Sequence, residues 1–215
     1  IYLLVDVSGS YQYLKDEDPE LQKKIYREAF LLIEEASSLL PKNISFKTLK
    51  INEFSSLSEV ICEAKIERKR LLGNNKKSRE VSFTQKQIFD EYLEPICLPI
   101  LMKTRTAQAT DIEGAINLTA ELAKAETGGP IFLMILSDFF EYKSDQLPSF
   151  KLELDNFKVA LIYRNIVNDT SGQQITLSKE QVLKWQKTIS DAGADKVFIA
   201  DERSDYQSKA LKELF

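Results

Sequence analysis

Short runs of apolar residues alternate along the chain with longer segments in which apolar residues recur every three to four positions. The short runs are typical of buried strands, whereas the spaced pattern gives a helix one apolar face. Strands are expected at 1–6, 44–51, 131–137, 157–163 and 196–200, with a weaker candidate at 58–66. Helices are expected at 19–40, 111–125, 178–193 and 205–215. This alternation predicts an α/β fold with a central, mostly parallel sheet and helices on both faces.

Polar residues and prolines mark the expected helix boundaries. Asp18 can cap the first helix, Pro19 suits its first turn, and Pro41 ends it. Ser178 and Ser204 are each followed three residues later by glutamine, which is a capping-box pattern for the last two helices.

An insertion-like segment is expected around residues 67–105. Its first part, 67–80, carries six Lys or Arg residues against two Glu, which predicts an exposed basic loop or, alternatively, a docking site for an acidic partner. Residues 84–102 have a helical pattern, and Pro95 and Pro99 are expected to break that helix.

The composition excludes several kinds of chemistry. The length fits one domain, residues 1–215, with ample core. Histidine is absent, which excludes Ser-His-Asp and Cys-His nucleophile pairs and histidine-containing zinc sites. Two cysteines cannot supply a zinc or iron–sulfur site alone, so any metal is expected to be a hard ion held by oxygen.

The net charge of −4 gives no support for a nucleic-acid partner. No apolar run approaches the roughly 18 residues of a membrane-spanning helix, and no signal peptide is visible. The sequence starts at Ile1 inside an expected strand, which indicates a trimmed or processed piece, so the compartment stays open. Cys62 and Cys97 could form a disulfide or remain two buried thiols.

Three polar clusters follow expected strands or precede an expected helix. Asp6, Ser8 and Ser10 follow the first strand, Thr110 stands directly before a helix, and Asp138 ends the most apolar strand. In an extended loop, alternate residues project to one side, so the first three can converge. Ligands of open α/β sheets bind beyond the carboxyl ends of the strands. Carboxylate and hydroxyl oxygens at that edge are suitable ligands for Mg²⁺.

These residues resemble a known family. The segment from Asp6 to Ser10 (DVSGS) matches the DxSxS signature of von Willebrand factor A (vWA) domains. Thr110 in ATDIEGAI looks like the later threonine of that family, and Asp138 in ILSDF looks like its strand-end aspartate. The resemblance covers essentially the whole chain and implies a Rossmann-like vWA fold. One departure is the gap of about 100 residues from Ser10 to Thr110, which is longer than usual for the family.

The resemblance implies a metal-ion-dependent adhesion site (MIDAS) with defined roles. Ser8 and Ser10 would bind Mg²⁺, or Mn²⁺, through their hydroxyls, and Thr110 would bind it directly or through water. Asp6 and Asp138 would act mostly through metal-bound waters and hydrogen bonds to the serines. A protein partner would supply a Glu or Asp carboxylate as the remaining ligand. The resemblance also implies that the last helix shifts when the metal coordination at the threonine changes.

The implied function is therefore a metal-dependent protein-binding module for adhesion or assembly, not an enzyme. One alternative is a scaffold that uses helix faces or the 67–105 segment without a metal. Another is a Mg²⁺-dependent phosphatase with Asp6 as nucleophile, although Ser8 stands where such enzymes carry a second aspartate. Each cluster alone could also be an ordinary loop cap or turn. Thr106 is a rival to Thr110 for the threonine position.

Overall fold

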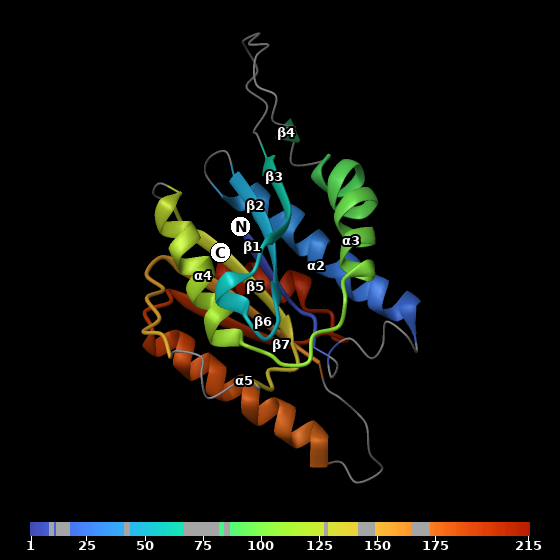
Figure 1. The fold of residues 1–215 in the computed structure, drawn as a ribbon. Coiled ribbons are helices and arrows are strands. Elements are labelled where there is room, and N and C mark those ends of the chain that lie inside the picture. Colours follow the sequence, from blue (N-terminus) through green and yellow to red (C-terminus); the bar gives the residue numbers. More distant parts are fainter. Residues whose placement is uncertain are drawn as a thin grey trace.

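The structure, a computed structural model, describes residues 1–8, 11, 18–40, 44–66, 82–83, 87–126, 129–141, 149–164 and 173–215, with backbone alone at 82–83 and 173–178. Within these residues one seven-stranded sheet has the strand order β4-β3-β2-β1-β5-β6-β7 (Figure 1). Its strands are β1 (Tyr2–Asp6), β2 (Ile44–Ile51), β3 (Val60–Ile66), β4 (Ser82–Phe83), β5 (Ile131–Ser137), β6 (Phe157–Tyr163) and β7 (Lys196–Asp201). Every neighbouring pair is parallel except β2 and β3, so the mostly parallel sheet is confirmed.

The direction of winding reverses at β1. The chain continues from β1 to β2 and β3 on one side, and later adds β5, β6 and β7 on the other side. Every residue of β1 is buried, which explains its continuous apolar run. Such a reversal opens a crevice at the carboxyl ends of the strands that flank it, and here these strands are β1 and β5.

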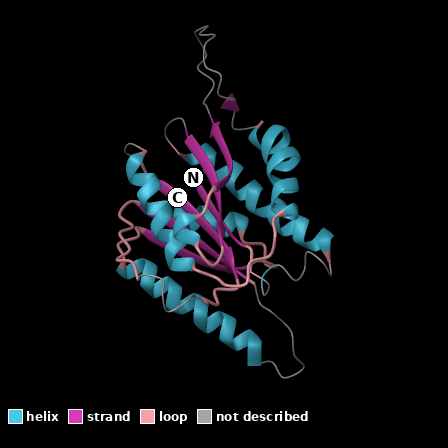
Figure 2. Ribbon diagram, viewed as in Figure 1, coloured by secondary structure: helices cyan, strands magenta, loops and turns pink. Residues whose placement is uncertain are grey.

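Helices cover both faces of the sheet, as expected (Figure 2). One face packs against α2 (Pro19–Leu39), η2 (Phe89–Cys97), α3 (Leu98–Lys103) and α6 (Gln207–Leu214). The other face packs against α4 (Ile112–Ala125) and α5 (Gln173–Asp191). A single 3₁₀ turn, η1 (Ser55–Leu57), follows β2 and contacts α4.

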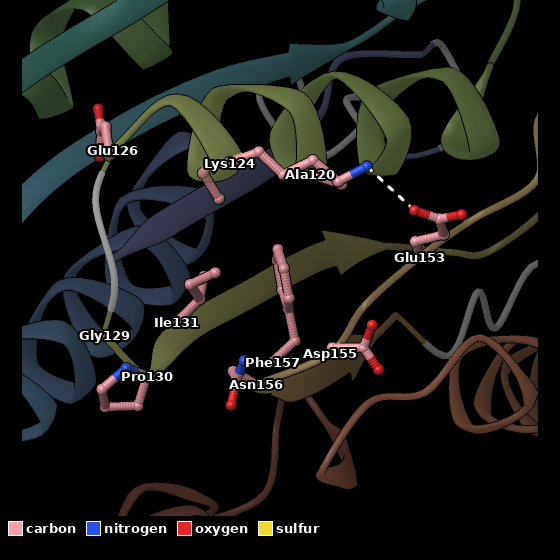
Figure 3. Close-up of a pocket in the computed structure, with 11 residues that line it drawn as sticks. Ala120, Lys124, Glu126, Gly129, Pro130, Ile131, Glu153, Asp155, Asn156 and Phe157 are labelled. Atoms are coloured by element: carbon pink, nitrogen blue, oxygen red, sulfur yellow. Dashed lines mark hydrogen bonds and ion pairs between the residues drawn. The ribbon is translucent and has the colours of Figure 1, made fainter.

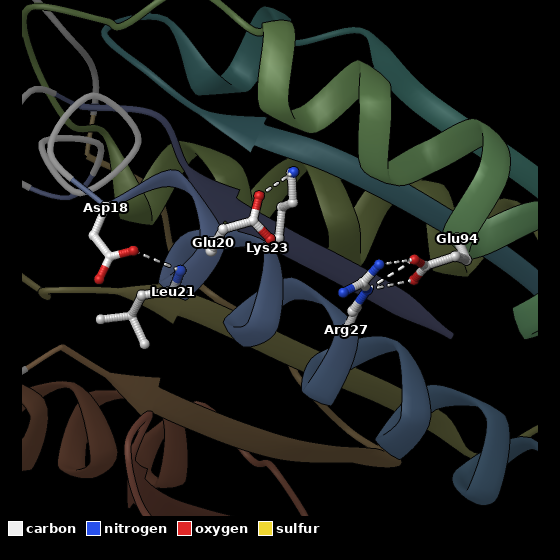
Figure 4. A network of polar contacts seen from close by, with 6 residues as sticks. All are labelled: Asp18, Glu20, Leu21, Lys23, Arg27 and Glu94. Atoms are coloured by element: carbon white, nitrogen blue, oxygen red, sulfur yellow. Dashed lines mark hydrogen bonds and ion pairs between the residues drawn. The ribbon is translucent and has the colours of Figure 1, made fainter.

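Helix α2 has the start that its sequence predicts (Figure 4). The Asp18 carboxylate accepts a hydrogen bond from the Leu21 N–H at 3.0 Å, and Pro19 is the first helical residue. About two turns further on, Arg27 makes a two-pronged ion pair with Glu94 of η2, with its Nε 2.7 and 2.9 Å from the two carboxylate oxygens. This exposed pair lies where η2 packs against α2.

The expected break at Pro95 and Pro99 is wrong, because η2 and α3 form one continuous helical stretch. Pro95 lies inside η2, which is a π-helix, and the wider turns of a π-helix already depart from the regular ladder of i to i−4 hydrogen bonds. Pro99 is the second residue of α3, directly after the junction between the π-helix and the α-helix. The first part of the 67–105 segment, residues 67–81, lies outside the described residues.

Two capping predictions are also wrong. Helix α5 begins at Gln173, so Ser178 lies inside the helix instead of at its start. The Ser204 hydroxyl donates to the Asp201 carbonyl at 2.7 Å, and α6 begins at Gln207 without a side-chain cap. Serine hydroxyls can bind the local backbone in turns as well as at helix starts, and the Ser204 hydroxyl binds the turn after β7.

The two cysteines are both buried free thiols, one on β3 and the other at the end of η2. Next to them, the Tyr92 hydroxyl of η2 accepts from the Glu63 N–H at 3.0 Å and donates to the Glu63 carbonyl at 2.6 Å. Tyr92 therefore binds both backbone groups of one residue on β3, the strand next to the two-residue edge strand β4.

Candidate functional site

The site begins with Asp6, the last residue of β1, whose side chain is fully buried. One carboxylate oxygen accepts from the Ser8 N–H at 2.8 Å, and the other accepts from the Ser137 hydroxyl at 2.6 Å. Ser137 is the last residue of the neighbouring strand β5. The parallel pairing of β1 and β5 thus brings two strand ends together, and a short side-chain hydrogen bond connects them.

Asp138 follows β5 directly and is also fully buried. One of its carboxylate oxygens accepts from the Phe140 N–H at 3.0 Å. Burial, and then the charge of Asp138, raise the pKa of Asp6 to about 7, although hydrogen bonds from Ser137 and Ser8 act in the opposite direction. Two carboxylates this close together in the interior resist being ionised at the same time.

The backbone has an unusual conformation directly after Asp138. Phe139 has a φ of 62°, in the left-handed region that bulky residues seldom adopt. The Ser137 hydroxyl accepts from the Phe139 N–H at 2.9 Å, so one serine binds both this segment and Asp6. Such conformations persist where surrounding contacts hold them, and this hydrogen bond is one of those contacts.

The segment before α4 lies against the end of β1. The Ala107 N–H donates to the Val7 carbonyl at 2.7 Å, and Ala107 forms an isolated parallel bridge with Ser8. Three residues later Thr110 is 2% exposed, whereas Thr106 is exposed. The structure therefore places Thr110 in the interior at the same edge, which favours it over Thr106 as the threonine of the site.

Asp111 fixes the start of α4 directly after Thr110. Its N–H donates to the Asn52 carbonyl at 2.9 Å, and its carboxylate accepts from the Gly114 N–H at 2.9 Å. A side-chain carbon at position 114 would lie 2.0 Å from a carboxylate oxygen of Asp111, so only glycine fits this cap as built. The position of Thr110 is thus set by a buried capping residue on one side and by the β1 end on the other.

The structure brings three of the five predicted site residues, Asp6, Ser8 and Asp138, into mutual contact or charge interaction, and it places Thr110 at the same edge. Ser10 lies outside the described residues. Within the part of the chain that is described, no group of three or more His, Cys, Asp or Glu side chains could hold a metal. A metal at this edge would therefore need the serine and threonine hydroxyls in addition to the two carboxylates.

Hard divalent cations prefer oxygen ligands, and the two carboxylates and the Ser8 hydroxyl supply such oxygens. The groups that act on the pKa of Asp6 are Asp138, which raises it, and Ser137 and Ser8, which lower it. A proton on Asp6 would relieve the repulsion between the two carboxylates, and a divalent cation would relieve it with both of them ionised.

Sequence reasoning missed Ser137 and Asp111. Ser137 is the last residue of an apolar run, directly before Asp138, and a polar residue at that place in a buried strand is a usable signal. Asp111 could have been found as a helix cap, because it stands three residues before a glycine inside an amphipathic segment.

Two cavities lie at opposite edges of the sheet. One, of about 610 Å³, adjoins the site at Val7 and Ala107 and carries Lys50 and Arg105 on its walls. The other, of about 560 Å³, lies at the amino ends of β5 and β6 beside the last turns of α4 (Figure 3). The second cavity has none of the five predicted site residues on its walls.

Nine chains among the solved structures match this one. A von Willebrand factor type A protein from Catenulispora acidiphila matches with a TM-score of 0.50 and 10% identity, over 99% of this chain and 42% of that chain. The chain has a vWA-like fold. An aerotolerance-related membrane protein from Bacteroides fragilis, crystallised with multiple mutations to serines, matches with a TM-score of 0.50 and 11% identity, over 99% of this chain and 96% of that chain.

The chain spans less than half the length of the first of these proteins. At such low identities the likeness concerns the fold alone. No protein-family profile matches the sequence, and no curated protein matches it. None of the helices in the described part of the chain is both long enough and apolar enough to cross a membrane.

Proposed function

We propose that this vWA-like chain is a protein-binding module that grips a partner carboxylate through a divalent cation. The cation would be Mg²⁺ or Mn²⁺ at the carboxyl ends of β1 and β5. The partner would supply the Glu or Asp side chain, and the module would serve adhesion or assembly without catalysing a reaction.

The observation that carries this proposal is the pair of fully buried carboxylates at neighbouring strand ends, Asp6 and Asp138. Two buried like charges cost stability unless a compensating charge or a proton lies between them. A site that binds a cation explains their presence.

Ser8 and Thr110 would contribute hydroxyl oxygens, and Ser10 is the further hydroxyl that the motif supplies. The two carboxylates would hold these hydroxyls and the waters of the cation in place through hydrogen bonds. A bound Mg²⁺ with mostly neutral ligands stays electrophilic and supplies a strong attraction for an outside carboxylate.

Two features argue against the phosphatase reading. Asp6 is fully buried, and each of its carboxylate oxygens accepts a hydrogen bond, so a nucleophilic attack would first have to break that arrangement. The next alternate residue is Ser8, so the aspartate that would act as general acid is missing from that position.

Titration calorimetry with Mn²⁺ and with Mg²⁺ tests the metal site. Wild type should bind one divalent ion, and Asp6→Asn, Ser8→Ala and Thr110→Ala should each weaken binding by tenfold or more. Thr106→Ala is the matched control, because it removes the same hydroxyl from an exposed threonine four residues away. Absence of divalent-ion binding by wild type would sink the proposal.

Capture of partner proteins with and without EDTA tests whether a partner binds through the metal. A partner that leaves the protein in EDTA and on Asp6→Asn substitution supports a metal bridge. Equal retention in EDTA would instead favour the scaffold function, in which helix faces or the 67–105 segment make the contacts.

A further inference from the structure

Arg164 is a fully buried cation beside the candidate site. It follows β6 directly, and its backbone N–H donates to the Ser137 carbonyl at 3.1 Å. The main chain of Arg164 is therefore attached to the strand end that carries Asp138.

The guanidinium of Arg164 contacts three different segments of the chain. Its Nε lies 2.5 Å from a carboxylate oxygen of Glu202, which follows β7. Its Nη2 donates to the Gln22 side-chain carbonyl of α2 at 2.9 Å. Its Nη1 donates to the backbone carbonyl of Tyr11, and its central carbon stacks over the Tyr11 ring at 4.0 Å from the centroid.

Glu202 closes this cluster. Its second carboxylate oxygen accepts from the Tyr11 hydroxyl at 3.1 Å, and its backbone N–H donates to the Tyr163 carbonyl at 3.0 Å. The charge of Arg164 is compensated by a fully buried partner, and the planar fork of an arginine holds such contacts in fixed directions. Tyr11 is thereby bound through its ring, its hydroxyl and its carbonyl.

The contact with Tyr11 bears on the site because Tyr11 stands three residues after Ser8. The Ser8 N–H is held by Asp6, so both ends of a three-residue step are fixed. Three residues span roughly 10 Å at most, so Arg164 holds the chain within that distance of Ser8.

We propose that Arg164 is a positioning residue for the candidate metal site, because it fixes Tyr11, three residues after Ser8, relative to the Asp138 strand end. The expected effect on metal binding rests on the proposed function. The contacts of Arg164 with Tyr11 and Glu202, here called the clamp, are present in the metal-free protein.

Two readouts separate the clamp from the metal. Hydrogen exchange of the Ser8 and Tyr11 amides in EDTA reports the clamp, and Mn²⁺ titration at temperatures well below unfolding reports the site. The test variant is Arg164→Met/Glu202→Met, which removes both buried charges together and leaves neither alone. Tyr11→Phe is the matched control, because it removes one hydrogen bond of the same cluster and keeps the Arg164 contact with the Tyr11 carbonyl.

We expect the double variant to exchange these two amides about tenfold faster and to bind Mn²⁺ about tenfold more weakly, as when a residue that orients metal ligands is lost. Tyr11→Phe should stay within about twofold of wild type in both readouts. If the double variant does not fold, Arg164→Lys keeps the charge, loses the fork and carries the same expectation.

Wild-type exchange and wild-type Mn²⁺ affinity in the folded Arg164 variant would overturn the inference. Equal losses in Tyr11→Phe would also overturn it, because they would indicate general loosening of the core. If wild type binds no Mn²⁺, the proposed function fails, and the exchange of the two amides in EDTA still decides whether Arg164 clamps the segment.

Discussion

Two groups of charged residues at opposite edges of the sheet differ in their burial. At the amino-end edge, Lys124 pairs with Glu121 and Glu153 at 3.2 Å each, and all three side chains are more than half exposed beside an open cavity (Figure 3). At the carboxyl-end edge, Asp6 and Asp138 are fully buried near one another, as is the Arg164 pair with Glu202.

This difference separates exposed charges from buried ones. Exposed ion pairs contribute little, because water solvates each partner nearly as well. Buried charges carry a desolvation penalty that a compensating group must offset. Glu202 offsets it for Arg164, and the proposed cation would offset it for Asp6 and Asp138.

The largest effect is expected from Arg164→Met. This substitution leaves Glu202 buried without its cation, and removing one partner of a buried pair typically costs about 3–5 kcal/mol. Urea unfolding monitored by circular dichroism measures the loss of free energy of unfolding. Arg164→Met/Glu202→Met should recover most of it, and a single variant as stable as wild type would contradict the burial argument.

The next effect concerns pH. The folded pKa of Asp6, about 7, is above its ordinary value near 4, so the folded state keeps a proton that the unfolded chain has lost. The stabilising contribution is complete below about pH 4 and is lost as pH rises through 7, by on the order of 4 kcal/mol in EDTA. Urea unfolding between pH 4 and 8 measures it.

Asp6→Asn should remove most of this pH-dependent loss, and Mg²⁺ should reduce it in wild type. Asp155→Asn is the control at the amino-end edge, where the aspartate is exposed, and it should follow the wild-type profile. Parallel pH profiles for wild type and Asp6→Asn would show that the two buried carboxylates do not repel one another as the structure indicates.

Alanine substitutions of two glycines, one at each edge, should change the free energy of unfolding by smaller and unequal amounts. Gly114→Ala places a methyl group on the Asp111 cap, so it should destabilise by about 1–2 kcal/mol, although alanine normally stabilises a helix. Gly129→Ala, at the amino-end cavity, has nothing within 4 Å and should change stability by less than about 0.5 kcal/mol. Thermal and urea unfolding of both variants measures the contrast, and a stabilised Gly114→Ala protein would refute the cap.

The smallest effect is expected from Lys124→Met. Because Lys124 and its glutamate partners are exposed, the substitution should leave the melting temperature unchanged within the precision of differential scanning calorimetry. It should leave Mn²⁺ binding unchanged too. A clear loss of either would mean that the amino-end edge has a role of its own.

The sequence predicted the strands because their apolar runs are local signals, and it predicted the common edge of Asp6, Thr110 and Asp138 because strand ends follow from the strands. It missed Arg164 and Ser137 for the opposite reason. The Arg164 contact with Tyr11 spans 153 residues, and the Ser137 contact with Asp6 spans 131. Contacts of this kind depend on strand order, which a sequence pattern does not reveal.

Predictions from local sequence patterns were wrong where one residue type is compatible with two local structures. Pro95 predicts a helix break, but a π-helix accommodates it. Ser204 has the spacing of a helix cap, but its hydroxyl binds the turn before the helix. The sequence favours Thr110 over Thr106 because Thr110 stands directly before a helix, and the burial of the two side chains adds a second distinction. The metal itself stays a prediction, since hydroxyl ligands leave no compositional signature.

The attachment of Tyr92 to β3 has a consequence for self-association. Open sheet borders are where copies of a protein add to one another as extra strands and begin to aggregate. Tyr92 occupies the N–H and carbonyl of Glu63, the groups that such an incoming strand would need. The side chain of a helix residue thus protects this border against strand addition, and Tyr92→Phe would expose both backbone groups while leaving the β2–β3 pairing in place.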